Sequence, residues 1–419
     1  MREMKDSGVE WIGEIPEDWD IVPTKRFFRS TKRVVGNEVD NYERLALTMN
    51  GVIKRSKEDS EGLQPEQFEG YQILRKNELV FKLIDLENVR TSRVGLSPYT
   101  GLVSPAYIVL TNESKDNRFY YYWFMSMYYN EIFNHIGGDG VRSALNARDL
   151  ATIPVVSIPI HIQHCIADYL DEQCAKIDTV IAKQRELIIK LGAYKQSIII
   201  ETVTKGLNSN VEMKDSGVVW IGKIPCHWNI LKLKAHTSML TPMRDKPQDL
   251  DGEIPWIRIE DYVGKYISES KEGFGVSIET VNEMNLKIYP VGTILCTSSC
   301  DLGKCAIVSK ELVSNQRFIG IIPDDKTLPD YLYYLMLSNT ERLNHLSTGT
   351  IQANLSRVAF EHLLVQFPPY EEQKEIVGFL DKKCNAIDNA TTIKQKMIDR
   401  LIAYKKSLIY ETVTGKREI

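Results

Sequence analysis

The chain has 419 residues, which is enough for two or three domains of about 150 residues each. Its hydrophobic fraction of 43% supports sizeable cores and argues against intrinsic disorder. The 52 basic and 56 acidic residues exclude a uniformly basic protein that coats nucleic acid, although a balanced total leaves room for a local basic patch. The sequence contains neither the apolar core of a secretory signal nor an uncharged apolar run of about 18 residues, so we expect a cytoplasmic protein.

The first recognisable element is a short motif, MKDSGVEWIGEIPEDW, at residues 4–19. It returns at residues 213–228 as MKDSGVVWIGKIPCHW, with twelve of the sixteen positions identical. An internal repeat at about half the chain length indicates two copies of one structural unit. The tryptophans of both copies, Trp11 with Trp19 and Trp220 with Trp228, are predicted to anchor this repeated frame.

The first motif is followed by about 140 residues that do not resemble the corresponding part of the second half. β-like runs at 79–84 and 107–111 alternate in this first insert with an aromatic helical stretch, FYYYWFMSMYYNEIF. The second insert has β-like runs at 292–297 and 318–322 and the helical stretch YLYYLMLSNTERL. A constant frame that holds two divergent inserts indicates a general role for the frame and a particular role for each insert.

Each half closes with a long amphipathic segment, at residues 165–204 and 375–414. Apolar residues recur there at alternating spacings of four and three, the pattern of a coiled-coil seam, with polar breaks at equivalent positions in both copies. The shared pattern favours two helices of about 60 Å that pack on each other over two helices that each cover their own domain. The predicted seam residues are Ile166, Leu170, Ile177, Val180, Leu187, Leu191, Tyr194, Ile198, Ile376, Leu380, Ile387, Met397, Leu401, Tyr404 and Leu408.

Signatures of catalysis are missing from the sequence: there is no P-loop, dinucleotide-binding fingerprint, nucleophile elbow or H-E-x-x-H. FPPY at 367–370 is similar to a motif of amino-methyltransferases, but Phe367 cannot accept a hydrogen bond from a target amino group. Cys296, Cys300 and Cys305 form no C-x-x-C pair, which argues against a zinc site. We therefore expect a chain with no catalytic site, no metal and no cofactor of its own.

Taken together, these motifs resemble the specificity subunit of type I restriction–modification systems along nearly the whole chain. The resemblance is carried by the doubled MKDSG-V-x-W-I-G-x-I-P-x-x-W motif, the helix entry at 368–381, and the stretches GLVSPAYIVL and SNQRFIGIIP. The first helix entry, IPIHIQ, departs from the pattern because it lacks the glutamate that the second entry, FPPYEEQ, contains.

The resemblance implies an α+β fold with two α/β target recognition domains, joined by two long antiparallel coiled-coil helices in a pseudo-twofold repeat. The domains implied are a first target recognition domain at 1–157, a central long helix at 158–206, a second target recognition domain at 207–367 and a C-terminal long helix at 368–419. Each recognition domain would read one half of a bipartite, asymmetric double-stranded DNA site, and the helices would set the gap between the halves. Two modification subunits and two restriction subunits would be the partners, and these would use S-adenosylmethionine, ATP and Mg. No membrane is implied.

Candidate DNA contacts follow from residue type, because Lys and Arg bind phosphates while Arg, Asn, Gln, Ser and Thr read base edges. We selected polar and basic residues in glycine-rich or turn-like stretches of the two inserts. They are Lys82, Arg90, Arg93, Arg142, Ser143, Asn146 and Arg148 in the first insert, and Ser298, Ser299, Lys304, Asn315, Gln316, Arg317, Thr350, Gln352, Asn354 and Arg357 in the second. The alternative for each is a solvated loop residue or a turn former.

Two other function classes stay open at this point. The chain could be a coiled-coil protein–protein adaptor without sequence-specific DNA binding, in which the inserts bind protein loops. It could also be a self-sufficient methyltransferase or nuclease, which the missing cofactor and metal motifs argue against.

Overall fold

The structure is a computed structural model that describes residues 2–49, 51–58, 67–86, 93–136, 144–242, 246–299, 302–346 and 355–419. The chain divides into two compact units. Unit 1 consists of Met1–Arg185 together with Gln395–Ile419, and unit 2 consists of Glu186–Lys394. Each long helix is therefore shared between the units, so the partition by contacts differs from the predicted partition by consecutive chain segments.

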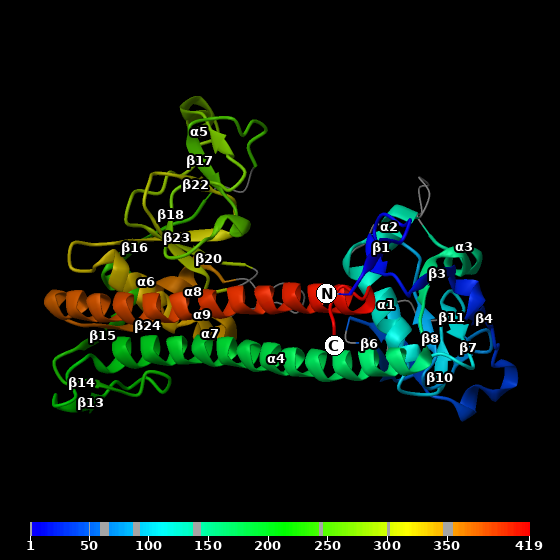
Figure 1. The fold of residues 1–419 in the computed structure, drawn as a ribbon. Helices are drawn as coiled ribbons and strands as arrows, with labels where there is room; N and C mark the ends of the chain where they lie inside the picture. The colour runs from blue at the N-terminus through cyan, green and yellow to red at the C-terminus, as the bar shows by residue number, and fades with distance from the viewer. Residues whose placement is uncertain are drawn as a thin grey trace. The chain divides into compact units, whose positions relative to one another are not determined.

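The two long helices are α4, Ile160–Lys205, and α9, Tyr370–Val413. Within each unit, a segment of one helix runs antiparallel beside a segment of the other (Figure 1). In unit 1 the start of α4 lies beside the end of α9, and in unit 2 the end of α4 lies beside the start of α9. The predicted pairing of the two repeated helices is thus present inside both units.

A glycine follows the end of each long helix, one position earlier in the second copy of the repeat than in the first. Gly206 and Gly415 have φ values of 72° and 74°, a left-handed conformation that favours glycine after a helix. A Cβ at Gly206 would approach Trp228 to 3.1 Å, and a Cβ at Gly415 would approach Trp19 to 3.0 Å. The end of each helix therefore packs directly against a buried tryptophan of the repeated frame.

The frame itself has the same pairing in both copies. The motif folds as a hairpin, and the strand after it pairs with the strand that precedes the long helix, so the two ends of each insert are held together. In unit 1 these strands are β1 Met4–Asp6, β2 Glu14–Pro16, β3 Asp20–Pro23 and β12 Pro154–Ser157. In unit 2 they are β13 Met213–Asp215, β14 Lys223–Pro225, β15 Asn229–Lys232 and β24 Leu364–Phe367.

The first insert contains two four-stranded sheets, with strand orders β6-β5-β10-β7 and β4-β11-β8-β9. Helix α1 packs on β9, and its aromatic residues are largely buried. The strands are β4 Arg29–Ser30, β5 Arg44–Thr48, β6 Gly51–Arg55, β7 Gln72–Leu74, β8 Leu79–Phe81, β9 Val94–Leu96, β10 Gly101–Val103 and β11 Ile108–Thr111. The helices are η1 Thr24–Arg26, η2 Gly36–Asn41, α1 Asn117–Tyr129, α2 Ile132–Ile136 and α3 Ala147–Thr152.

The second insert contains a five-stranded sheet of order β16-β23-β20-β21-β18 and a three-stranded sheet of order β19-β17-β22. Helix α6 packs on β20, β21 and β23. The strands are β16 Thr237–Leu240, β17 Ile254–Ile257, β18 Tyr266–Ile267, β19 Gly275–Val276, β20 Ile294–Thr297, β21 Cys305–Val308, β22 Val313–Ser314 and β23 Phe318–Pro323. The helices are η3 Leu233–Ala235, η4 Ile259–Asp261, α5 Ile278–Glu283, α6 Pro329–Ser338, α7 Thr340–Leu346 and α8 Arg357–Glu361. The predicted strands and aromatic helices of both inserts are confirmed.

The core of unit 2 joins the frame, the insert and both long helices in one cluster. Buried Trp228, Val203, Tyr331 and Leu380 come from these four parts of the chain and belong to the same cluster. The insert is therefore packed onto the helices and not merely tethered to them.

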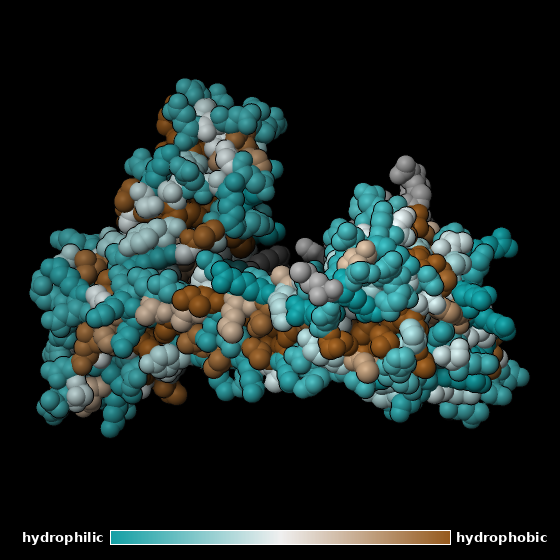
Figure 2. Space-filling model, viewed as in Figure 1, coloured by the Kyte–Doolittle hydropathy of each residue, from teal (hydrophilic) through white to brown (hydrophobic). Residues whose placement is uncertain are grey.

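At one of its two heptad positions the predicted seam is exposed in the later part of each helix, although Ile166 and Ile376 at the same position are buried. Apolar residues also reach the surface along the long helices (Figure 2). The predicted seam residues that lie exposed are Leu187, Tyr194, Met397 and Tyr404. Those that lie buried are Ile166, Leu170, Ile177, Ile198, Ile376, Leu380, Ile387 and Leu408, and Val180, Leu191 and Leu401 are half-buried.

The next residue along takes the inward position in each exposed case. Met397 is 44% exposed, whereas its neighbour Ile398 is 2% exposed. Lys195 and Lys405 occupy the same position of the repeat and are half-buried, with their ammonium groups paired to carboxylates. A search for apolar residues passes over lysines, although a lysine can bury its aliphatic stem and keep its charge at the surface.

None of the helices in the described ranges is both long enough and apolar enough to cross a lipid bilayer.

Candidate nucleic-acid interface

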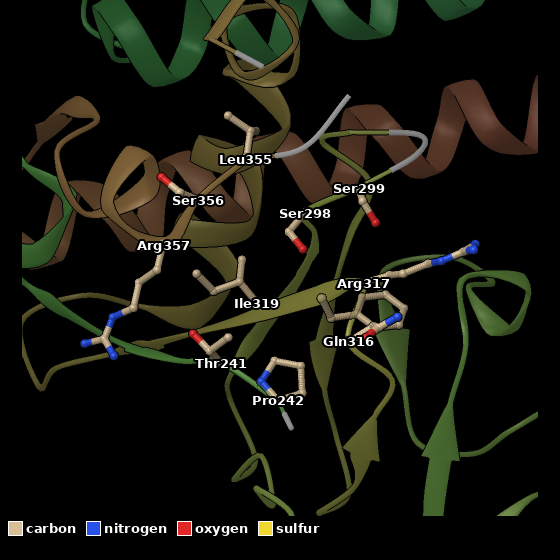
Figure 3. Close-up of a pocket in the computed structure, with 11 residues that line it drawn as sticks. Thr241, Pro242, Ser298, Ser299, Gln316, Arg317, Ile319, Leu355, Ser356 and Arg357 are labelled. Atoms are coloured by element: carbon tan, nitrogen blue, oxygen red, sulfur yellow. The ribbon is translucent and has the colours of Figure 1, made fainter. Parts of the chain in front are cut away.

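A cavity of about 530 Å³ opens in unit 2 at one end of the five-stranded sheet (Figure 3). It collects side chains from four places: the end of β16, the end of β20, the turn before β23, and the start of α8. Its lining residues are Thr241, Pro242, Ser298, Ser299, Gln316, Arg317, Phe318, Ile319, Leu355, Ser356 and Arg357.

Strand pairing explains why these residues meet. β20 and β23 are antiparallel neighbours in which Thr297 pairs with Phe318, so the residues after β20 and the residues before β23 share one sheet edge. The backbone N–H of Ser298 donates to the carbonyl of Arg317 at 2.8 Å, which continues the ladder beyond the strands. The N–H of Leu355 donates to the carbonyl of Ser298 at 2.8 Å and brings the start of α8 to the same place.

The cavity wall is positively charged. It contains two arginines and no carboxylate among its lining residues. Arg317 is exposed and has no ion pair within the described part of the chain, whereas Arg357 donates from Nε to Glu361 at 2.6 Å. In Figure 3 the two arginine side chains extend on opposite sides of the cavity, with Ser298 between them. Exposed guanidinium, amide and hydroxyl groups around one hollow are the groups that bind phosphates and base edges.

Five of the residues predicted from the sequence line this cavity: Ser298, Ser299, Gln316, Arg317 and Arg357. Lys304 and Asn315 lie nearby in sequence but are not among the lining residues.

Asn315 has a structural task in the turn before β23. Its side-chain oxygen accepts from the N–H of Arg317 at 3.0 Å, which shapes the turn that presents Gln316 and Arg317. Asn315 therefore shapes the turn through its amide oxygen, and its predicted contact with DNA stays a prediction.

Asn146 has a comparable task at the start of α3 in unit 1. Its side-chain oxygen accepts from the N–H groups of Arg148 at 2.7 Å and Asp149 at 3.2 Å. The N–H of Asn146 in turn donates to the carboxylate of Asp149 at 2.9 Å. This is a capping box, so the amide oxygen of Asn146 is occupied by the helix start. The side chain of Arg148 is exposed on that helix.

Arg93 lies inside unit 1 and is 1% exposed. Its guanidinium donates to the carbonyls of Ile84 at 2.8 Å and Asp85 at 2.6 Å, and burial lowers the pKa of Arg93. The structure therefore assigns Arg93 to holding this loop, in place of the predicted phosphate contact. Lys82 is half-buried at the end of β8.

Six predicted contacts lie outside the described residues: Arg90, Arg142, Ser143, Thr350, Gln352 and Asn354. Their roles stay predictions.

Sequence reasoning missed two polar lining residues, Thr241 and Ser356. Thr241 follows β16, which pairs with β23, and Ser356 caps α8 by accepting from the N–H of Ala359 at 3.3 Å. Knowledge that β16 pairs with β23 would have identified Thr241 as a lining residue. No local sequence motif predicts that long-range pairing.

The described residues contain no group of three or more His, Cys, Asp or Glu side chains positioned to hold a metal ion. Cys296 and Cys305 face each other across β20 and β21, and burial raises the pKa of the Cys296 thiol. Both cysteines belong to the apolar core of unit 2.

Comparisons with known proteins agree on one family. Residues 240–398 match the family described as the type I restriction modification DNA specificity domain. The specificity subunit of the type I restriction enzyme MjaIX from Methanocaldococcus jannaschii is 34% identical over 175 residues, a match that covers 40% of this chain and 40% of that relative. The putative MjaX specificity subunit of the same organism is 22% identical over 427 residues and is matched along 97% of this chain and 95% of its own length.

The fold also has a counterpart among solved structures. A chain from a structure described as the basis of complex assembly and conformational transition of a type I R-M system superposes with a TM-score of 0.71. It is 12% identical in sequence, and the superposition covers 95% of this chain and 98% of that one. At this identity the likeness shows a shared fold.

Proposed function

We propose that this chain, which is similar to the DNA specificity subunits of type I restriction–modification systems, selects the DNA sequence on which such a complex acts. Each insert reads one half of a bipartite, asymmetric site in double-stranded DNA. The paired long helices set the number of base pairs between the two halves. The protein–protein adaptor is the alternative that this proposal sets aside.

The cavity in unit 2 is the observation that carries the proposal. It presents Arg317, Gln316 and Ser298 at the edge of a rigid sheet, where backbone bonds fix the loops that bear them. Arg with two aligned N–H groups and Gln with its amide are suited to guanine and adenine edges in the major groove. A site of this kind can distinguish bases, whereas a diffuse basic surface would bind phosphates without regard to sequence.

The repeated frame supports the second part of the proposal. Two dissimilar inserts on equivalent supports fit a DNA site with two different half-sequences. Two readers on one duplex have to engage half-sites at a defined spacing, about 34 Å for each helical turn. Long helices that pair in both units are suited to impose such a spacing.

In this proposal the catalytic reactions are carried out by partner subunits. Two modification subunits bind the frame and methylate adenine with S-adenosylmethionine, and two restriction subunits use ATP and Mg for translocation and cleavage. This chain supplies recognition and scaffolding and no catalytic group, and it works in the cytoplasm, where such a complex meets chromosomal DNA.

The decisive experiment is to express the chain with its modification subunit and to map methylated positions across the host genome. We expect one motif made of two unlike half-sites with a constant gap. Replacing residues 20–156 with the insert of another family member should change one half-site and leave the other half-site and the gap intact. Methylation without a bipartite motif, or a swap that changes both halves, would contradict the proposal and favour the adaptor.

A further inference from the structure

Two aspartates at equivalent positions of the long helices, Asp171 on α4 and Asp381 on α9, have the same kinds of partner. The hydroxyl of Tyr122 donates to Asp171 at 2.7 Å, and the hydroxyl of Tyr334 donates to Asp381 at 2.6 Å. Each aspartate also binds a cation from its own insert. We call each set a tyrosine–aspartate–cation network: Tyr122, Asp171 and Arg118 in unit 1, and Tyr334, Asp381 and Lys265 in unit 2.

In unit 2 the cation, Lys265, forms ion pairs that connect three structural elements. Lys265, beside the edge strand β18, contacts Asp330 at the start of α6 and Asp381 on α9, both at 2.6 Å. Its side chain is only 17% exposed, and its ammonium lies 4.9 Å from the ring centre of Tyr334. Burial lowers the pKa of Lys265, but the two carboxylates outweigh it and raise the pKa above its ordinary value. The sheet, α6 and the long helix are thus joined at one charged centre.

In unit 1 the cation comes from a different part of the insert. Arg118 lies in the first turn of α1 and binds Asp168 at 2.6 Å and Asp171 at 3.0 Å, both on α4. It also pairs with Asp116, the residue that caps its own helix, at 2.9 Å. One guanidinium therefore joins the start of α1 to the long helix.

The inserts do not resemble each other in sequence, yet both direct a cation and a tyrosine hydroxyl to the equivalent aspartate. Apolar packing alone is weakly directional, so an insert held only by its core could tilt on the helix. Partly buried ion pairs add little net stability, but they fix geometry because each donor has to meet its acceptor. The common feature of the two networks is the point on the long helix at which each insert is fixed.

We propose that the two tyrosine–aspartate–cation networks are positioning devices that hold each recognition domain at one orientation on its long helix, and that they thereby restrict the gap accepted between the two DNA half-sites. This inference rests on the proposed function. Its residues act through the orientation of the domain and make no contact with DNA.

The test uses the complete complex with Lys265→Met and, separately, Tyr334→Phe, which removes one hydroxyl. Methylation is sequenced on a DNA pool that carries the wild-type half-sites with gaps one base pair shorter, equal and one base pair longer. We expect unchanged half-site sequences and a rise of about tenfold in the relative methylation of the altered gaps, the change that corresponds to one lost hydrogen bond to a charged group. Lys374→Met is the matched control, because Lys374 lies on the same helix and its contacts among the described residues, an ion pair with Glu371 and a cation–π contact with Tyr370, are within its own turn.

A second readout does not depend on DNA. Spin labels carried by unnatural amino acids replace Val291 in the insert and Ile393 on α9, which are exposed and belong to unit 2. The distance distribution between the labels should broaden in Lys265→Met and stay narrow in Lys374→Met. A narrow distribution in the Lys265 and Tyr334 variants, or unchanged gap preference in folded protein, would overturn the inference. A wild-type complex that shows no bipartite motif but whose labels respond as expected would reject the proposed function and leave the positioning role standing.

Discussion

Lys195 on α4 and Asp388 on α9 form an ion pair at 2.7 Å in unit 2, and Lys405 and Asp178 form the same pair at 2.7 Å in unit 1. The lysines are 210 residues apart in the chain, and so are the aspartates. The pairs are related by the internal repeat, and they connect antiparallel helix segments in the same register in both units. Each long helix contributes one lysine and one aspartate. Because the helices are antiparallel, the lysine of each copy meets the aspartate of the other copy.

Reversing one of these charges tests whether the pairs fix the helix register. Lys195→Asp should place two carboxylates side by side and lower the free energy of unfolding by about 1 kcal/mol, since the pair is partly exposed. The double variant Lys195→Asp with Asp388→Lys should recover most of the loss. Thermal unfolding of both variants measures this, and a double variant as unstable as the single one would speak against pairing.

Two neighbouring residues on α9 test the corrected seam. Ile398→Ala should cost about 2–5 kcal/mol because its side chain is buried, whereas Met397→Ala should cost less than about 0.5 kcal/mol because its side chain is exposed. Both substitutions remove a large apolar side chain from the same turn. Equal losses in the free energy of unfolding, measured by urea denaturation, would support the seam predicted from the sequence, in which Met397 points inward.

The buried indole of Trp228 depends on one carboxylate. Its Nε1 donates to Glu372 at 2.8 Å, whereas Nε1 of Trp19 has no hydrogen-bond partner in the described ranges because Ile162 stands at the equivalent helix position. Glu372→Ala should therefore cost about 1–3 kcal/mol by leaving a buried donor unpaired. Glu372→Gln retains an acceptor and should restore most of the stability in the same thermal melt; a Gln variant as unstable as the Ala variant would contradict this account.

Asp330 makes the stability of unit 2 dependent on pH. Burial raises the pKa of Asp330, but the hydrogen bonds from Lys265 and Tyr266 and the lysine charge lower it to below its ordinary value of 3.8. Because the folded value lies below the unfolded value, the carboxylate stabilises the fold at pH above about 4, and this contribution is lost as the pH falls through the folded value. The difference in melting temperature between the wild type and Asp330→Asn should be large at pH 6 and shrink toward pH 3. A difference that stays constant over this range would exclude the carboxylate as its source.

The two arginines of the cavity should differ in their effect on DNA binding. Arg317 has no ion pair among the described residues, so Arg317→Ala should weaken binding of the complex to its site by about 1–3 kcal/mol and relax the choice of base at one position. Arg357 is already paired with Glu361, so Arg357→Ala should have a smaller effect. Fluorescence anisotropy with matched and single-mismatch duplexes separates these outcomes, and equal losses on all duplexes for Arg317→Ala would indicate a phosphate contact instead.

The repeat, the long helices and the main strands of both inserts could be predicted because they depend on local periodicity. The seam was predicted only in part, since Lys195 and Lys405 occupy inward positions through their aliphatic stems. Polar loop residues were the hardest to interpret: Gln316 and Arg317 line the cavity, whereas Asn146 and Asn315 bond to the backbone beside them. Residue type cannot separate these uses, because the same side-chain amide caps a helix, closes a turn or reads a base. The networks at Asp171 and Asp381 depend on contacts between distant segments that no local motif encodes.

Unit 1 is discontinuous in the chain, and this determines the order in which the protein can be completed during synthesis. Its last segment, 395–419, leaves the ribosome after every residue of unit 2 has been made. Unit 2 can therefore finish folding first. Until the end of α9 has been synthesised, the apolar face of α4 in unit 1 stays exposed to solvent. A nonsense mutation in the codons for residues 395–419 would consequently harm unit 1, although most of that unit is encoded before unit 2.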